Sequence, residues 1–422
     1  MAGKAKSDPI ADILKTAEKK YNLTVGPMNA LVEGVKFITT GNIAIDYAIG
    51  GGIPLGRSVE LYGPPSCGKT TTGLQTAAEL QKVIKAGGDE ARGIFPDDRI
   101  LYLDYEQAMD KDYAKALGLD TDDESFLFTQ PDTLEDGTNL TLELLKTGKI
   151  RLVIFDSLAA MNPSVKAEAE IGKSLPAVQA KLMKDFGLNL NPVLRHNNAT
   201  VIFLNHETEV MDMGGARRPG MPPATTTSGG KATKYFASVR VQYRQIKQIK
   251  GEVPDPLTNE KIERVMSTDV RVKVEKNKVA PPFRTVSVRV RFGTGFDNYW
   301  TAMQILVANK KVMYQTGRYY FHNIAEQGFA PEWMKREDKG TQRPYIWGEK
   351  ALFAAADNDP AWRLGLIRLA EDVVEESVDA LSKVAPVRSE GASVDEDDEE
   401  AARELDEILE DASVSAGRRV EI

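Results

Sequence analysis

The residues with the most specific chemistry form a glycine-bounded loop that begins at Gly63. Its members, with the threonine that follows, are Gly63, Pro64, Pro65, Ser66, Cys67, Gly68, Lys69, Thr70 and Thr71. Up to Thr70 they match the pattern G-x-x-x-x-G-K-[ST], whose backbone N–H groups cradle phosphates. In such a loop Lys69 reaches the β- and γ-phosphates, and the Thr70 hydroxyl holds Mg²⁺. The loop therefore predicts a nucleoside triphosphate site.

Two carboxylates are expected beside this loop, because each follows a short apolar strand. Asp156 ends the predicted strand Leu152–Asp156, where it can hold Mg²⁺ through water. Glu106 follows the predicted strand Ile100–Asp104, and neighbouring parallel strands open onto one crevice. Glu106 can orient water there for attack on the γ-phosphate, with Asp104 as a less favoured candidate. The alternative is that both residues only cap the next helix.

Two lysines and a long segment without periodicity are further candidates. Lys276 and Lys278 point the same way along an extended chain, so their ammonium groups can clamp a triphosphate. A charged solvent edge is the alternative. Residues 206–230 form a long glycine-rich stretch with Arg217 and Arg218. Such a segment suits a phosphodiester backbone, although an ordinary surface loop fits the composition equally.

The order of apolar runs predicts an α/β fold with a mixed, mostly parallel sheet flanked by helices. The predicted strands are Ser58–Tyr62, Ile100–Asp104, Leu152–Asp156, Thr200–Asn205, Ala237–Ile246, Val270–Lys276 and Thr285–Arg291. The first four are short and apolar, as in buried parallel strands. The last three alternate with polar residues, as in antiparallel strands. A helix is expected from Thr70 to Ala86, directly after the glycine-bounded loop.

Composition shifts divide the chain into several predicted parts. These are a short N-terminal oligomerisation helix and linker at 1–34, a core at 35–297 with loops at about 160–181 and 206–230, a small aromatic-rich α+β domain at 298–386 and an acidic, disordered tail at 387–422. The N-terminal helix has one apolar stripe, which must pack on its own domain or on a neighbouring subunit.

Charge and composition narrow the function classes. The 422 residues carry a net charge of −8, but residues 390–411 hold twelve acidic residues and one arginine, which leaves about +3 elsewhere. This distribution is compatible with a nucleic-acid binder whose tail competes for its basic surface, or with a solubilising tail. One cysteine, Cys67, and three histidines argue against disulfides and zinc sites. Without a membrane-length apolar run or a secretory signal, we expect a cytoplasmic protein with no membrane partner.

Several separate segments resemble the RecA recombinases of bacteria and their phage relatives of the UvsX type. The segments are Ile38–Arg57, Tyr105–Asp110 with Tyr113, Gln130–Thr133, Ala224–Arg240 and Lys276–Phe283. The resemblance extends from roughly residue 8 to residue 380. It implies a RecA-like P-loop ATPase core that binds ATP and Mg²⁺ between successive subunits of a helical filament. It also implies binding of single-stranded and duplex DNA, with single-strand-binding and loader proteins as further partners.

The resemblance also assigns roles to individual residues. It makes Glu106 the water-activating base, Asp156 a support for Mg²⁺, and Lys276 and Lys278 groups that act on the ATP of the next subunit. The other nucleotide contacts that it implies are Asp110 and Tyr113 at the adenine, Phe292 and Gly293 near the nucleotide, and His206 as the γ-phosphate sensor. The DNA contacts that it implies are Lys173, Lys181, Arg217, Arg218, Gly229, Gly230 and Lys231.

The chain departs from the bacterial pattern at several positions. His206 stands where bacterial members have glutamine and where phage UvsX-like proteins have histidine, so coupling of the γ-phosphate to DNA could be pH-sensitive. Pro176 stands where an apolar side chain that wedges between bases is expected, and Leu188 where a basic residue is usual. These departures put individual DNA contacts in question.

The resemblance leaves alternatives to strand exchange open. The chain could be an accessory DNA-binding ATPase, or a protein that promotes self-cleavage of a repressor, without exchanging strands. Retention of Glu106 and of both lysines, Lys276 and Lys278, argues against an inactive ATPase. A ring helicase with a related core is disfavoured by the same lysine segment and by the lack of a zinc module.

Overall fold

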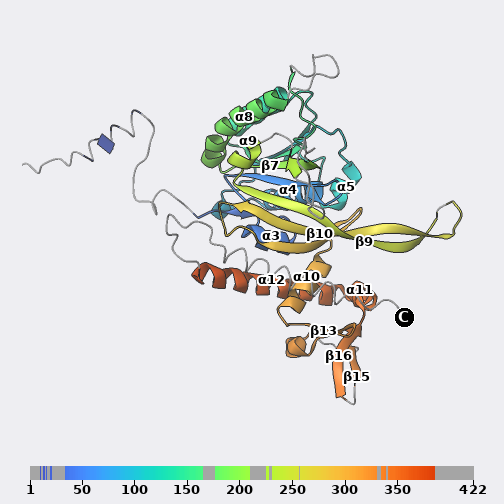
Figure 1. Cartoon of the computed structure of the whole chain (residues 1–422). Coiled ribbons are helices and arrows are strands. Elements are labelled where there is room, and N and C mark those ends of the chain that lie inside the picture. Colours follow the sequence, from blue (N-terminus) through green and yellow to red (C-terminus); the bar gives the residue numbers. More distant parts are fainter. Residues whose placement is uncertain are drawn as a thin grey trace, which may run out of the picture. The chain divides into compact units, whose positions relative to one another are not determined.

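A computed structural model gives the fold of the chain (Figure 1). It describes residues 34–164, 176–209, 225–227, 231–255, 257–329, 334–338 and 341–384, with the single positions 10, 13, 14, 16 and 20. The acidic tail and most of the predicted N-terminal segment lie outside the described residues. So do five candidate DNA contacts, Lys173, Arg217, Arg218, Gly229 and Gly230.

A ten-stranded sheet is the centre of the fold, and its strand order is β12-β11-β10-β9-β3-β7-β6-β4-β5, with β8 paired to β7. The strands are β3 Ser58–Gly63, β4 Arg99–Asp104, β5 Phe126–Thr129, β6 Ile150–Asp156, β7 Thr200–Glu209, β8 Thr225–Thr227, β9 Val239–Pro254, β10 Lys261–Asn277, β11 Thr285–Arg291 and β12 Gly295–Phe296. The pairings from β9 through β5 are parallel, and those from β9 to β12 are antiparallel. The predicted mixed, mostly parallel sheet is confirmed.

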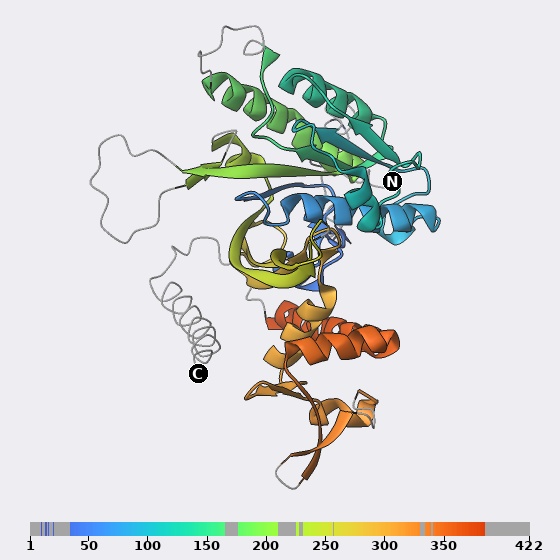
Figure 2. The same ribbon diagram turned by 90° about the vertical axis from the view of Figure 1, so that its right-hand side faces the viewer.

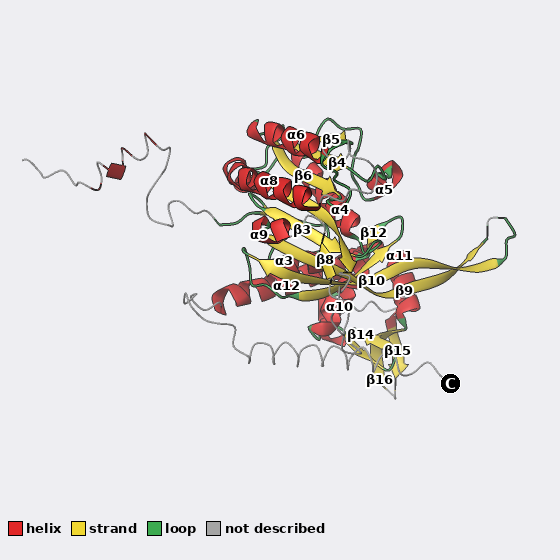
Figure 3. Cartoon of the chain, turned by 45° about the horizontal axis from the view of Figure 1, so that its top comes forward, coloured by secondary structure: helices red, strands yellow, loops and turns green. Residues whose placement is uncertain are grey.

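Helices cover both faces of this sheet (Figure 3). They are α3 Ile43–Ile49, α4 Lys69–Lys85, α5 Lys111–Ala116, α6 Leu134–Lys146, α8 Pro176–Asn197 and α9 Lys231–Phe236, and a small ladder joins β1 Phe37–Ile38 to β2 Ile53–Pro54. Strand β7 shows why its sequence is continuously apolar. Ile202 and Leu204 join the hydrophobic cluster that contains α4, whereas Val201 and Phe203 join the cluster that contains α8. Both faces of the strand are therefore buried.

Strands β9 and β10 are longer than the predicted strands and form a ribbon that extends beyond the sheet (Figure 1). The sequence indicated only their inner halves, where one face is buried and polar residues alternate with apolar ones. In the outer half, at residues 247–254 and 261–266, no residue is buried, so the buried face that marks the inner half is absent. Cross-strand ion pairs support the ribbon, with Lys250 at 2.7 Å from Glu263 and Lys261 at 3.2 Å from Glu252.

The predicted small α+β region after the core has its own hydrophobic cluster, which includes Tyr299, Phe321 and Trp362. Its sheet has the order β13-β14-β16-β15 and appears in orange in Figure 2. Its elements are α10 Asn298–Ala308, β13 Met313–Gln315, β14 Arg318–Tyr320, β15 Lys335–Asp338, β16 Thr341–Trp347, α11 Glu349–Asn358 and α12 Pro360–Val384. Within the described part of the chain, no helix is both long and apolar enough to cross a membrane.

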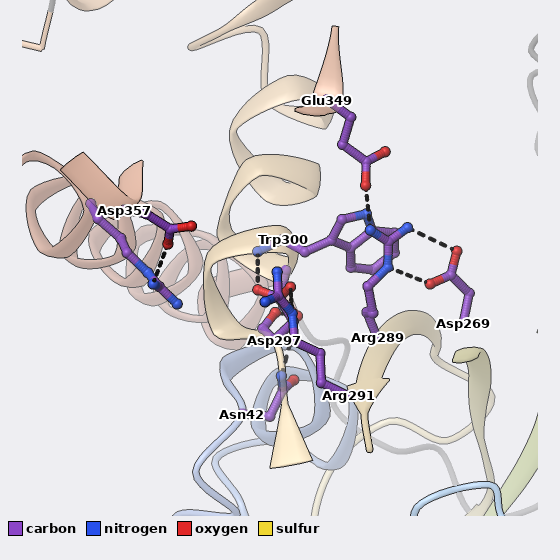
Figure 4. Close-up of polar contacts among 10 residues, drawn as sticks. Asn42, Asp269, Arg289, Arg291, Asp297, Trp300, Glu349 and Asp357 are labelled. Atoms are coloured by element: carbon purple, nitrogen blue, oxygen red, sulfur yellow. Dashed lines mark hydrogen bonds and ion pairs between the residues drawn. The ribbon is translucent and has the colours of Figure 1, made fainter. Parts of the chain in front are cut away.

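Two arginines of β11 join this region to the sheet (Figure 4). Arg289 is paired with Asp269 of β10 at 2.7 Å, contacts Glu349 of α11, and its guanidinium lies 4.7 Å from the Trp300 ring centre. Arg291 pairs at 2.6 Å with Asp297, the N-cap of α10. The start of α10 is thereby fixed to the end of the sheet that carries the candidate site.

Candidate nucleotide-binding site

The glycine-bounded loop joins β3 to α4, and two glycines make its path possible. Gly63 has φ of 151° and Gly68 has φ of 86°, which are values that other residues rarely adopt. A Cβ atom on Gly63 would lie 2.2 Å from the carbonyl oxygen of Tyr243, and one on Gly68 would lie 2.9 Å from a methyl carbon of Val290. Gly68 caps α4 without a side chain, so the backbone N–H groups of the first turn face the loop.

Lys69 is folded back onto the loop. Its ammonium donates to the carbonyl oxygens of Gly63 at 2.9 Å and Pro64 at 2.6 Å, and the residue is only 6% exposed. Burial lowers the pKa of Lys69, which means that the loop surrounds a cation without a full counter-charge. An anion such as a phosphate fits this environment.

Thr70 and Asp156 bring two oxygen atoms together beside the loop. The Thr70 hydroxyl donates to the Asp156 carboxylate at 3.1 Å, and the Tyr102 hydroxyl donates to the same oxygen at 2.6 Å. Burial raises the pKa of Asp156, whose exposed fraction is 8%. Oxygen donors of this kind suit Mg²⁺, which keeps several waters and phosphate oxygens as its other ligands. Among the described residues, no cluster of three or more histidine, cysteine and carboxylate side chains forms a metal cage.

Glu106 lies just beyond β4 with two polar partners. The Ser157 hydroxyl donates to its carboxylate, and His206 Nε2 shares a hydrogen bond of 2.9 Å with the same oxygen. The hydrogen bond to His206 is the main reason that the pKa of Glu106 is lowered, so this carboxylate is ionised. His206 pairs with Gly63 in the β3–β7 register, which places it at the end of the phosphate loop's strand. The sequence reasoning missed Ser157, although its position directly after Asp156 was a usable signal.

Asp104 has a different environment from Glu106. Its carboxylate accepts the backbone N–H groups of Ala108 and Met109 and a 3.1 Å hydrogen bond from Gln130. These contacts hold the loop after β4. They favour a role for Asp104 in holding this loop over a role in orienting water, whereas the next helix, α5, is capped by Asp110.

Four residues were expected at the adenine or elsewhere near the nucleotide, and the structure places them in two groups. Asp110 caps α5 by accepting the backbone N–H of Tyr113, and the Tyr113 hydroxyl shares a 2.7 Å hydrogen bond with Thr71 of α4. Tyr113 therefore reaches the helix that follows the phosphate loop. Phe292 and Gly293 form the turn after β11, where Phe292 is 48% exposed and Gly293 has φ of 83°.

The structure places Lys276 away from the phosphate loop of its own subunit. Its ammonium donates to the carbonyl oxygens of Lys234 at 2.6 Å and Tyr235 at 3.1 Å, near the end of α9. Burial, helped by the nearby charges of Lys278 and Arg240, lowers the pKa of Lys276 to about 8. Lys278 is exposed and lies just beyond the end of β10 at Asn277.

The described ends of the two predicted loops contain regular structure. Helix α8 begins at Pro176, so Lys181 lies in a helix rather than in the first loop, which was predicted to extend to about 181. Proline is tolerated in the first helical turn, which explains this early start. Strand β7 continues to Glu209 and pairs with β8, so the second loop is shorter than residues 206–230. Lys231 opens α9.

The strand–loop–helix geometry, with a buried aspartate and an ionised glutamate at neighbouring strand ends, defines a P-loop nucleotide-binding protein. Comparison with known proteins shows to which family of P-loop proteins the chain belongs. The family model of the RecA N-terminal domain matches residues 4–297. Protein RecA of Bordetella avium (strain 197N) is 33% identical over 377 residues, which cover 88% of this chain and 95% of that relative. The chain belongs to the RecA family.

Proposed function

We propose that this chain is an ATP-dependent DNA recombinase, which forms a helical filament on single-stranded DNA and catalyses homologous pairing and strand exchange. The observation that carries this proposal is the hydrogen bond between Glu106 and His206. It joins a carboxylate beside the phosphate loop to β7, the strand that leads into the second candidate DNA loop. Membership of the RecA family supports the same function.

In the proposed ATPase reaction each side chain has a distinct task. The N–H groups of the loop and Lys69 bind the phosphates, and Thr70 and Asp156 hold Mg²⁺, which neutralises phosphate charge when bound. Glu106 accepts a proton from the attacking water. Ser157 and His206 fix the position of that carboxylate and keep it ionised.

Lys276 and Lys278 serve the ATP of the adjacent subunit in this proposal. The contacts of Lys276 with the end of α9, rather than with its own loop, support a role in trans. Two cations at the γ-phosphate would stabilise the charge that develops during transfer. ATP bound at each junction then stabilises the assembled state, and a head-to-tail junction that does not close produces a filament.

The proposed DNA contacts come from the two loops, at about 160–181 and 206–230, and from the C-terminal α+β region for duplex DNA. The residues proposed to contact DNA are Lys173, Lys181, Arg217, Arg218, Gly229, Gly230 and Lys231. Single-strand-binding and loader proteins are proposed partners, and the proposed location is the cytoplasm of a bacterium or of a phage-infected cell.

ATP hydrolysis measured with and without single-stranded DNA tests this function. We expect strong stimulation by DNA and its loss in Lys69→Ala, because the loop then lacks its buried cation. Lys82→Ala is a matched control, since Lys82 is an exposed lysine on the same helix. Hydrolysis that is indifferent to DNA would leave the nucleotide site intact and contradict the recombinase function.

A further inference from the structure

A row of polar side chains crosses four neighbouring strands of the sheet. It consists of Asn205 on β7, Glu60 on β3, Arg240 on β9 and Lys276 on β10. Glu60 pairs with Arg240 in the β3–β9 register, and Arg240 pairs with Lys276 in the β9–β10 register. Glu60 and Arg240 therefore project to one face of the sheet. Lys276 lies at a β-bulge and reaches the same face, because its ammonium contacts α9, and Ser58, two residues from Glu60, also donates to α9 at Phe236.

Glu60 is the centre of this row and is completely buried, with an exposed fraction of 0%. Both of its carboxylate oxygens are used. Asn205 Nδ2 donates to Oε1 at 2.8 Å, and Arg240 Nε donates to Oε2 at 2.6 Å. Glu60 therefore fixes the side-chain amide of one neighbouring strand and the guanidinium of the other.

The first end of the row reaches the candidate catalytic site. Asn205 Oδ1 accepts a hydrogen bond of 2.9 Å from the backbone N–H of His206, and the His206 ring is hydrogen-bonded to Glu106. The orientation of the Asn205 amide, which Glu60 sets, thus contributes to the position of His206. A displacement of His206 by a bound γ-phosphate would shift the Asn205 side chain and, through it, change the hydrogen bond to Glu60.

The second end of the row reaches the lysine proposed to act in trans. Arg240 lies 3.7 Å from the Glu275 carboxylate and 4.5 Å from the ring centre of Tyr62. Its positive charge repels that of Lys276, whereas the negative charge of Glu60 attracts it. Arg240 is held by Glu60 at the shorter distance, so a change at Glu60 alters the field in which the Lys276 ammonium is held against α9.

A purely structural role is the competing explanation for this buried ion pair. The chain contains a second buried pair, Arg151 with Asp98, whose side chains are 3% and 1% exposed and 2.9 Å apart. The contacts of that pair tie the starts of β4 and β6 to the end of α8, away from the phosphate loop. The Glu60 pair differs because its partners lead to His206 on one side and to Lys276 on the other.

We propose that Glu60 is a positioning residue that couples His206, beside a subunit's own nucleotide, to Lys276, which the same subunit offers to the next nucleotide. This inference rests on the proposed function. The state of one ATP site would thereby bias the neighbouring site, as a coupling free energy between two ligands requires. Hydrolysis along a filament would then respond cooperatively to ATP.

The test is the Hill coefficient for ATP in DNA-stimulated hydrolysis by the full chain. Glu60→Gln keeps the shape and the acceptor for Asn205, but it removes the charge that Arg240 faces. We expect a wild-type coefficient clearly above one and a Glu60→Gln coefficient close to one. Asp98→Asn, which breaks the other buried pair, is the matched control and should keep the wild-type coefficient.

A Glu60→Gln protein that is folded and retains the wild-type coefficient would overturn the coupling role. A loss of equal size in Asp98→Asn would overturn it as well, because general destabilisation would then explain both. If Glu60→Gln does not fold, Arg240→Lys replaces it as the test variant, since it retains a cation and loses the Nε hydrogen bond to Glu60. An unchanged Hill coefficient in Arg240→Lys would then refute the proposal. Wild-type hydrolysis stimulated by DNA with a coefficient of one refutes the coupling alone, whereas no stimulation refutes the function itself.

Discussion

The lowered pKa of Lys276 makes its proposed role in trans testable by pH. Burial and two neighbouring cations bring this pKa from 10.5 to about 8, so the ammonium loses its proton as the pH rises through that value. At pH 9, one unit higher, only about a tenth of the lysines remain charged. If the charged form contacts phosphate, kcat/KM for ATP should therefore be about tenfold lower at pH 9 than on its plateau.

Lys276→Arg should remove this decline at high pH, because arginine stays protonated throughout the range from pH 7 to 10. We expect kcat/KM of the variant, measured with saturating single-stranded DNA from pH 7 to 10, to lack the decline that starts near pH 8. The shape of the profile is the readout, since arginine also changes the geometry of the contact. Lys278→Arg, at an exposed position two residues away, is the matched control and should keep the decline, because it leaves Lys276 unchanged. Identical profiles for the wild type and Lys276→Arg would refute the assignment.

Three further predictions concern the loop, the sensor and the core. Gly63→Ala places a Cβ 2.2 Å from a carbonyl oxygen, and strain of this type costs about 1–3 kcal/mol. A fluorescent ATP analogue should therefore bind to the variant about tenfold more weakly or worse. Unchanged affinity would refute the close approach. His206→Gln should alter the pH profile of hydrolysis between about pH 5.5 and 8, and an identical profile would exclude a pH-sensitive coupling. Asp98→Asn leaves the buried Arg151 without its carboxylate partner, so the free energy of unfolding in urea should fall by about 3–5 kcal/mol. Asp97→Asn, in an exposed pair, should leave this free energy unchanged. Equal effects of the two substitutions would contradict the burial argument.

The fold was predictable where a strand is buried on at least one face. The strand Thr285–Arg291 was predicted with the bounds that the structure has, because its alternation of polar and apolar residues is uninterrupted. The outer parts of β9 and β10 were not predicted, since none of their residues is buried and the ribbon depends on cross-strand pairing. The short strands β5 and β12 were also missed, because so few residues give no reliable period.

The candidate site was only partly predictable. Lys69 and Thr70 follow from a loop pattern that is local in sequence, and Asp156 follows from its place at a strand end. The contact between Glu106 and His206 joins residues a hundred positions apart and depends on the strand order, which neither local sequence specifies. The sequence held one usable signal for the role of Glu60. It is the single charged residue in the otherwise uncharged strand Ser58–Gly63, and a buried charge requires a partner.

Formation of joint molecules between single-stranded DNA and homologous duplex DNA tests the central claim most directly. We predict that the full chain with ATP and Mg²⁺ pairs homologous DNA and not heterologous DNA, and that Lys69→Ala, which lacks the cation of the phosphate loop, forms no joint molecules. ATP hydrolysis that is stimulated by DNA without any homologous pairing would contradict the account and favour an accessory DNA-binding ATPase.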